Sequence, residues 1–251
     1  LGPAACVPEV GPIGTLPWYF ENGLVADGDP ALAFGRQPGP NGFSWANGSR
    51  LYYANLSSNI GTKKEETFKG FEAIYVSRTD NPQLAATGGE AGKAAWRRPV
   101  RVSKQSSSTF SDKEQIWADN AATSPHFGNV YVCWANFIGA SAPMVVATSR
   151  DGGDTWAQQN VSPAHNVAPK HWGQSGCTIR TDSRGVVYVF YEEFQNPSKV
   201  GLPPIGTHFL VKSFDGGDTW TKPMELYTVT DPCFALNFDG AGLRCVEDGV
   251  G

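Results

Sequence analysis

The chain has 251 residues, and its 20 basic and 24 acidic side chains give a formal net charge of −4 at pH 7. The Lys and Arg residues are scattered, so no face could neutralise several phosphates at once, and no apolar stretch is long enough to cross a bilayer. A content of 29 Gly and 18 Pro indicates many turns between short strands. These features exclude a nucleic-acid partner and a membrane span, and they favour an all-β protein.

The pattern of apolar residues predicts three successive units of four antiparallel strands. Residues 1–28 precede them as an N-terminal extension or partial sheet, and residues 227–251 follow as the start of a further unit or a C-terminal extension. In the first unit the corresponding hairpin turn, S-R-T-D-N at 77–81, is followed by a long insertion. The expected strands are 30–34, 49–56, 71–78 and 95–102; then 114–118, 129–137, 143–149 and 155–161; then 176–181, 186–194, 207–213 and 219–226.

The last two units share an octet, S-R-D-G-G-D-T-W at 149–156 and S-F-D-G-G-D-T-W at 213–220. Each octet lies between two strand-like runs, so we expect it to form the turn of a hairpin. Its paired glycines can adopt positive φ without steric cost, and the first aspartate can accept backbone N–H bonds across the turn. A repeated turn at equivalent places in two units identifies an internal repeat.

The second strand of the third unit, V-V-Y-V-F-Y at 186–191, is apolar on both faces and should be covered on both sides. Four-stranded sheets of about sixty residues packed between copies of themselves are typical of β-propeller blades. A two-sheet sandwich fits less well, because each of its sheets buries one face. We therefore expect blades at about 29–103, 104–162 and 163–226, forming part of a six-bladed ring with further blades beyond Gly251.

The octet matches S-x-D-x-G-x-T-W and resembles the Asp box, or BNR repeat, of the sialidase-like propellers. A second resemblance, to secreted bacterial sialidase-like proteins, lies in D-K-E-Q-I-W-A-D-N and S-P-H-F-G-N-V-Y-V-C-W, between Asp112 and Trp134. The matching Asp-box residues are Ser149, Asp151, Gly153, Thr155 and Trp156, and Ser213, Asp215, Gly217, Thr219 and Trp220.

The resemblance spans about residues 29–226. It implies an extracellular protein with a glycan or glycoconjugate as its partner, and a glycoside hydrolase of exo-sialidase type that cleaves terminal sugars. The alternative is a non-catalytic propeller that binds glycan or protein, because in this family the Asp box lies away from the active site and also occurs in proteins that are not sialidases.

Propeller topology places the octets at one end of the disc and the predicted ligand site at the other, where loops converge on the axis. Asp29 and Asp112 each stand just before an innermost strand, so both could point into this mouth as an acid and base pair. The alternative is that each caps a turn. Glu193, in the third unit, is at the position that Asn136 has in the second unit. It could be a base or the partner of a Tyr nucleophile; the alternative is a solvated strand end.

The same mouth contains six candidates for substrate contact. An indole face suits the apolar side of a pyranose, and imidazoles can handle protons; ordinary loop packing is the alternative. No familiar metal-ligand spacing is present, so we expect no metal and no cofactor, although Asp and backbone oxygens could hold Ca²⁺ without a recognisable pattern. The six residues are Lys113, His165, Lys170, His171, Trp172 and Gln174.

The chain departs from the sialidase pattern in its arginines. Sialidases hold the substrate carboxylate with three arginines, a Tyr paired with Glu acts as nucleophile, and an Asp serves as acid and base. No F-R-I-P-like segment is present and the predicted mouth loops contain no Arg, which leaves Arg180 and Arg244 as stand-ins. The missing arginines could lie beyond Gly251.

The five cysteines permit more than one arrangement. Cys133 and Cys177 lie in strand-like apolar runs and are predicted to be buried free thiols, with a bridge between neighbouring sheets as the alternative. Cys233 and Cys245 bracket a turn-rich segment and would close a short loop if oxidised, which leaves Cys6 unpaired.

Overall fold

A computed structural model describes residues 16–61, 66–139, 141–164, 172–195 and 205–230. In these ranges the chain forms three four-stranded antiparallel sheets, so the prediction of an all-β fold with four-stranded antiparallel blades is confirmed. The strands are β1 (Leu24–Gly39), β2 (Gly42–Asn59), β3 (Ala73–Thr79) and β4 (Val100–Arg101); β5 (Thr109–Ala118), β6 (Val130–Ile138), β7 (Met144–Ser149) and β8 (Ala157–Asn160); β9 (Trp172–Thr181), β10 (Val187–Gln195), β11 (Ile205–Ser213) and β12 (Met224–Thr230).

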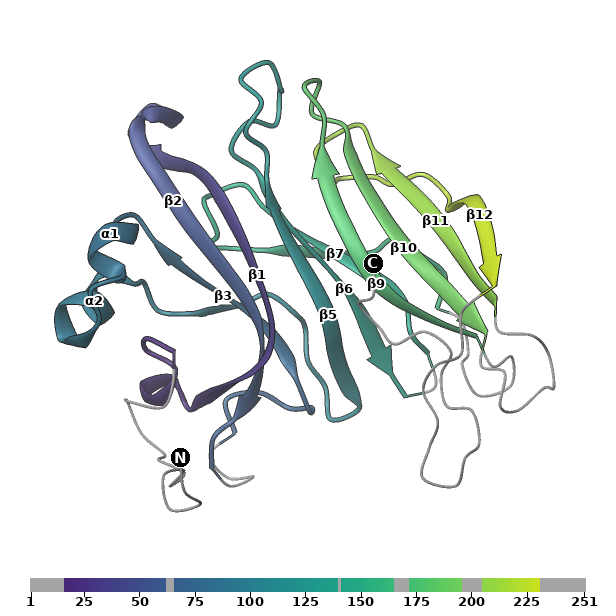
Figure 1. Ribbon diagram of the computed structural model, residues 1–251, viewed down its shortest axis with the longest axis horizontal. Helices are drawn as coiled ribbons and strands as arrows, with labels where there is room; N and C mark the ends of the chain where they lie inside the picture. The colour runs from purple at the N-terminus through teal and green to yellow at the C-terminus, as the bar shows by residue number, and fades with distance from the viewer. Residues whose placement is uncertain (1–15, 62–65, 140, 165–171, 196–204, 231–251) are drawn as a thin grey trace.

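Each sheet follows the chain, with neighbouring strands joined in sequence order, and the three sheets stand next to one another (Figure 1). Their first strands, β1, β5 and β9, contact one another in that order. This is the arrangement of consecutive propeller blades, each starting at its inner strand. The number of blades in a complete ring stays a prediction.

Two apolar clusters fill the spaces between the sheets. In β6 alternate residues serve both clusters: Val132 and Trp134 pack toward the first sheet, and Tyr131 and Cys133 toward the third. A strand buried on both faces has this two-sided apolar sequence. In β10 one face is buried in the same way, but Phe190 on the other face is 40 % exposed, because no described segment covers it.

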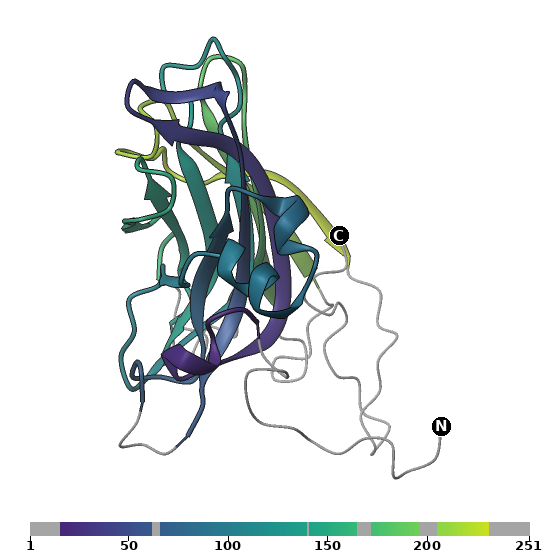
Figure 2. The ribbon, with the colours of Figure 1, turned by 90° about the vertical axis from the view of Figure 1, so that its left-hand side faces the viewer.

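The structure changes several predicted boundaries. The insertion after β3 forms two short helices, α1 (Pro82–Ala85) and α2 (Gly89–Ala95), at the outer edge of the first sheet (Figure 2), and only two residues pair as β4. A 3₁₀ turn (Phe20–Asn22) precedes β1. The inner strands also begin earlier than predicted. Asp29 and Asp112 therefore lie within β1 and β5 rather than ahead of them.

Both octets form the turns of hairpins, β7–β8 and β11–β12, as predicted. In the first, Asp151 Oδ1 accepts hydrogen bonds from Ser149 Oγ at 2.8 Å and from the amides of Asp154 and Thr155 at 3.0 and 2.9 Å. Asp215 makes the same three contacts at the same distances with Ser213, Asp218 and Thr219. The repeated sequence thus encodes a turn that is closed by its own side chains.

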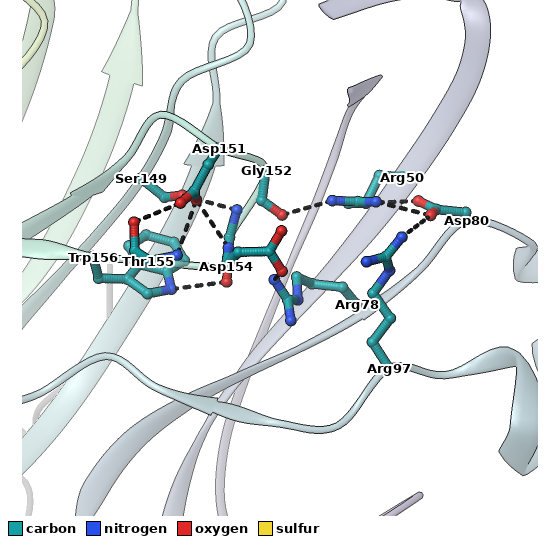
Figure 3. Close-up of polar contacts among 11 residues, drawn as sticks. Arg50, Arg78, Asp80, Arg97, Ser149, Asp151, Gly152, Asp154, Thr155 and Trp156 are labelled. Atoms are coloured by element: carbon teal, nitrogen blue, oxygen red, sulfur yellow. Dashed lines mark hydrogen bonds and ion pairs between the residues drawn. The ribbon is translucent and has the colours of Figure 1, made fainter. Parts of the chain in front are cut away.

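Each octet is also held by arginines of the sheet before it. Arg50 donates to the carbonyl oxygen of Gly152 at 2.9 Å while it forms a bidentate ion pair with Asp80, and Arg78 pairs with Asp154 at 2.5 Å (Figure 3). In the next sheet, Arg150 bonds the carbonyl of Gly216 at 3.2 Å and Asp218 Oδ1 at 2.8 Å. The octets therefore join neighbouring sheets as well as neighbouring strands.

The octet carboxylates should make stability fall in acid. Hydrogen bonding, chiefly from the Thr219 hydroxyl, lowers the pKa of Asp215 from 3.8 to about 2. Because the unfolded chain takes up this proton at higher pH than the fold does, the stabilisation is complete above pH 4 and is lost between about pH 4 and 2. We expect Asp215→Asn to lower the free energy of unfolding at pH 7 by about 1 kcal/mol, given solvent screening, and to flatten this dependence.

Denaturant unfolding measured at a series of pH values tests this expectation. Asp218→Asn is the matched control, because the Asp218 side chain bonds Arg150 rather than the amides of its own turn. An equal flattening in the control would contradict the assignment to Asp215.

The prediction of free thiols at Cys133 and Cys177 is wrong. Their sulfur atoms form a disulfide that joins β6 to β9, with the Cα atoms 6.3 Å apart. Apolar strand sequence suggested burial, which is correct, but pairing depends on which sheets pack together. Cys6, Cys233 and Cys245 lie outside the described residues. In the described ranges no helix has both the length and the apolar composition to cross a membrane.

Candidate functional site

The innermost strand of every sheet contains a β-bulge near the same end. Between the pairs Gly28–Leu56 and Ala31–Ala54, β1 advances three residues while β2 advances two. In the second sheet, β5 advances three residues between Asp112 and Gln115 while β6 advances two, from Ala135 to Cys133. In the third, β9 advances two residues between Ser175 and Cys177 while β10 advances one. Such bulges re-aim side chains and are frequent beside active sites.

One residue in each bulge adopts the left-handed conformation: Asp29 at φ 48°, Lys113 at φ 59° and Gly176 at φ 56°. Glycine takes this conformation freely, whereas each of the other two residues pays about 1–3 kcal/mol for it. Strained backbone of this kind persists where the surrounding structure fixes it, and it concentrates at functional sites. The three bulges therefore mark the axial end of the sheets as the candidate site.

The bulges line a cavity of about 310 Å³. Its size lies at the lower end of the usual range for ligand pockets, roughly 300–1,000 Å³. Lys113 Nζ lies 3.1 Å from Asp29 Oδ2 and 3.7 Å from Asp112 Oδ1, so one ammonium group joins carboxylates of two sheets. The lining residues are Asp29, Pro30, Lys113, Glu114, Gln115, Gly176 and Cys177.

Glu114 is the most unusual group in the lining. Its side chain is 4 % exposed, and neither carboxylate oxygen has a hydrogen-bond partner among the described residues. Burial raises the pKa of Glu114 to about 8; the proximity of its own backbone amide opposes this rise, and the nearby charges of Asp29, Asp112 and Glu72 add to it. A carboxyl group in this state holds its proton at neutral pH and can donate it.

The pKa of Glu72 is raised as well, by a smaller amount. It precedes β3, and its backbone carbonyl accepts a hydrogen bond from the Ser111 amide at the start of β5. Partial burial, followed by the charges of Asp27, Asp112 and Asp29, raises the pKa of Glu72 to about 7, while Lys113 acts in the opposite direction. The carboxyl groups around the cavity therefore oppose one another's ionisation in spite of the lysine.

The structure brings together three of the residues that the sequence nominated, Asp29, Asp112 and Lys113. It places Glu193 and Gln174 in a buried polar network instead. There Gln174 Nε2 donates to Glu193 Oε2 at 3.0 Å, and the Ser162 hydroxyl donates to the Gln174 side chain. Glu193 is thus a buried side chain, not a solvated strand end, and neither it nor Gln174 lines the cavity.

Most of the other nominated residues lie outside the described part of the chain. His165, Lys170, His171 and Arg244 lie outside the described residues, and Trp172 begins β9 with a side chain that is not described. The Arg180 guanidinium lies 4.7 Å from the ring centre of Trp117 and donates to its neighbouring backbone carbonyl, so it is not in the cavity lining.

Sequence reasoning missed Glu114 and Glu72. Glu114 is the second residue after Asp112, and simple strand alternation places the two on one face. The bulge at Lys113 breaks this alternation, and its left-handed backbone has no reliable sequence signal outside glycine. The only available hint was the run of charged residues D-K-E in an otherwise strand-like segment.

The described residues contain no group of three or more His, Cys, Asp or Glu side chains placed to hold a metal ion. The carboxyl groups of the cavity are instead joined through Lys113 or left without a hydrogen-bond partner, as Glu114 is. Carboxyl groups in this arrangement can transfer protons and act as nucleophiles.

No protein-family model and no curated protein matches the chain. Among solved structures, an α-L-arabinofuranosidase from Fusarium graminearum is 13 % identical with a TM-score of 0.43, covering 81 % of this chain and 49 % of its own. A Hadza microbial sialidase is 11 % identical with a TM-score of 0.41, covering 83 % of this chain and 47 % of its own. The chain spans about half the length of these two structures.

Proposed function

We propose that the chain belongs to a glycoside hydrolase whose active site is the cavity at the inner-strand bulges. The observation that carries the proposal is Glu114, a buried carboxyl group in the cavity wall that keeps its proton beside ion-paired carboxylates. Two carboxyl groups in opposite protonation states are the requirement for cleaving a glycosidic bond. A cavity of about 310 Å³ suits one sugar residue, which favours attack at the end of a glycan.

In this proposal Glu114 is the general acid that protonates the leaving oxygen. Asp29 or Asp112, held by Lys113, supplies the carboxylate that attacks the anomeric carbon or removes a proton from water. The Cys133–Cys177 disulfide supports an extracellular location, because structural disulfides persist in oxidising compartments. The competing function is a glycan-binding module that uses the same cavity without hydrolysis.

The pH dependence of hydrolysis tests this proposal. We expect turnover of chromogenic glycosides by the full-length protein, with kcat/KM falling as the pH rises through about 8, where Glu114 loses its proton. The groups that face Glu114 are Asp29 on β1, Tyr53 on β2, Glu72 before β3, and Asp112 and Lys113 on β5. Sugar binding without hydrolysis at any pH would favour the binding module.

A further inference from the structure

The charges around the cavity restrict the kind of sugar that it can hold. Two carboxyl groups line it, three more lie nearby and interact with these or with one another, and Lys113 is the single cation in its described lining. That lysine is already engaged by two carboxylates, Asp29 and Asp112. The five are Asp27, Asp29, Glu72, Asp112 and Glu114.

Two of these carboxyl groups, Glu114 and Glu72, have raised pKa values. Burial is the first cause in both, and the neighbouring carboxylates add to the rise. Burial and the neighbouring negative charges, which oppose ionisation of these two side chains, also oppose the entry of another anion. A sugar carboxylate would have to give up its hydration in these surroundings.

An uncharged sugar is not repelled by these carboxylates and has no charged group to dehydrate. Its hydroxyl groups can donate hydrogen bonds to ionised carboxylates and accept one from the protonated Glu114, whose oxygens have no partner among the described side chains. Each such hydrogen bond pairs a buried polar group of the protein, and leaving that group without a partner costs free energy.

We propose that the cavity takes an uncharged sugar residue and discriminates against sugars that carry a carboxylate. This inference rests on the proposed function for the site itself, and it differs from the anionic substrate that the resemblance to sialidases implies. The specificity arises from repulsion, which needs no dedicated binding group for the excluded sugar.

The test compares matched pairs of 4-nitrophenyl hexosides and hexuronides, which differ only in a carboxylate at C6. Binding to the full-length protein is followed by saturation-transfer NMR, and hydrolysis is followed separately. We expect the neutral member to bind roughly tenfold or more tightly at low salt, with the difference shrinking as ionic strength rises. A 2-amino-2-deoxyhexoside serves as the cationic comparison.

At pH 8, above its pKa of about 7, Glu72 is largely ionised, and Glu72→Gln, which removes this charge outside the cavity lining, should narrow the preference for neutral sugars. Glu90→Gln, the same change on the exposed surface of α2, should leave it unaltered. Equal or tighter binding of the hexuronide, or tightest binding of the amino sugar, would overturn the inference.

Binding and hydrolysis separate the two proposals. If neutral sugars bind selectively but are not cleaved, the hydrolase proposal fails and the inference on ligand class stands. If uronides are cleaved as well as neutral glycosides, the hydrolase stands and the inference fails. If no sugar of any kind binds, both are overturned.

Discussion

Glu114→Gln is expected to lower kcat/KM by roughly 10²- to 10⁴-fold on glycosides with a poor leaving group, because the amide cannot donate a proton to the departing oxygen. Glycosides whose leaving phenol is already acidic need little protonation and should be affected far less. This dependence on the leaving group distinguishes loss of the acid from general damage. Undiminished turnover across the whole series would remove Glu114 from the mechanism.

The stability of Glu114→Gln, measured as a function of pH, tests whether the variant is correctly folded. In the wild type the unfolded chain releases the Glu114 proton near pH 4.5, whereas the fold retains it to about pH 8. The wild type therefore loses stability as the pH rises across this interval, and the Gln variant, which has no proton to lose, should not. An inactive variant that is more stable than the wild type at pH 8 would locate the defect in chemistry. Glu90→Gln is the surface control.

Replacing both cysteines of the bridge, Cys133→Ala with Cys177→Ala, is expected to lower the free energy of unfolding by about 2–4 kcal/mol. The bridge closes a loop between residues 44 positions apart and links two sheets through their shared apolar cluster. Denaturant unfolding of the two proteins measures the loss.

The bridge should also matter for the site. Cys177 directly follows Gly176 in the β9 bulge, and its Sγ contacts the backbone carbonyl of Lys113 at 3.7 Å. We therefore expect kcat/KM of the double variant to fall even under conditions where the variant stays folded. Val189→Ala, which removes apolar volume from the same cluster without touching the bulge, is the control. Equal activity losses in both would assign the effect to packing alone.

The parts of the fold that were predictable are those with local causes. Asp215 binds the hydroxyl and amides of its own octet, so the turn could be recognised from eight letters. The continuous apolar run of β6, V-Y-V-C-W at 130–134, likewise reflects its burial on both faces. In both cases the signal lies within one short stretch of the sequence.

The candidate site was only half predictable, because its geometry depends on pairing between strands. Asp29 and Asp112 could be nominated from their places ahead of predicted strands. Glu114 could not be nominated in this way. The direction of its side chain depends on the extra residue in β5, and that bulge is defined only by the pairing of β5 with β6. The disulfide was missed for a related reason: Cys133 and Cys177 are neighbours across two sheets, and nothing near either cysteine in the sequence identifies its partner.

The cavity wall is shared by three sheets, with Asp29 from the first, Glu114 from the second and Gly176 from the third. No single sheet forms this cavity wall. A chain that has folded only its first sheet, during synthesis or after proteolysis, has only Asp29 and Pro30 of this wall in place. The proposed ligand binding at this place would therefore report on assembly of the sheets, because the wall is complete only when all three have docked.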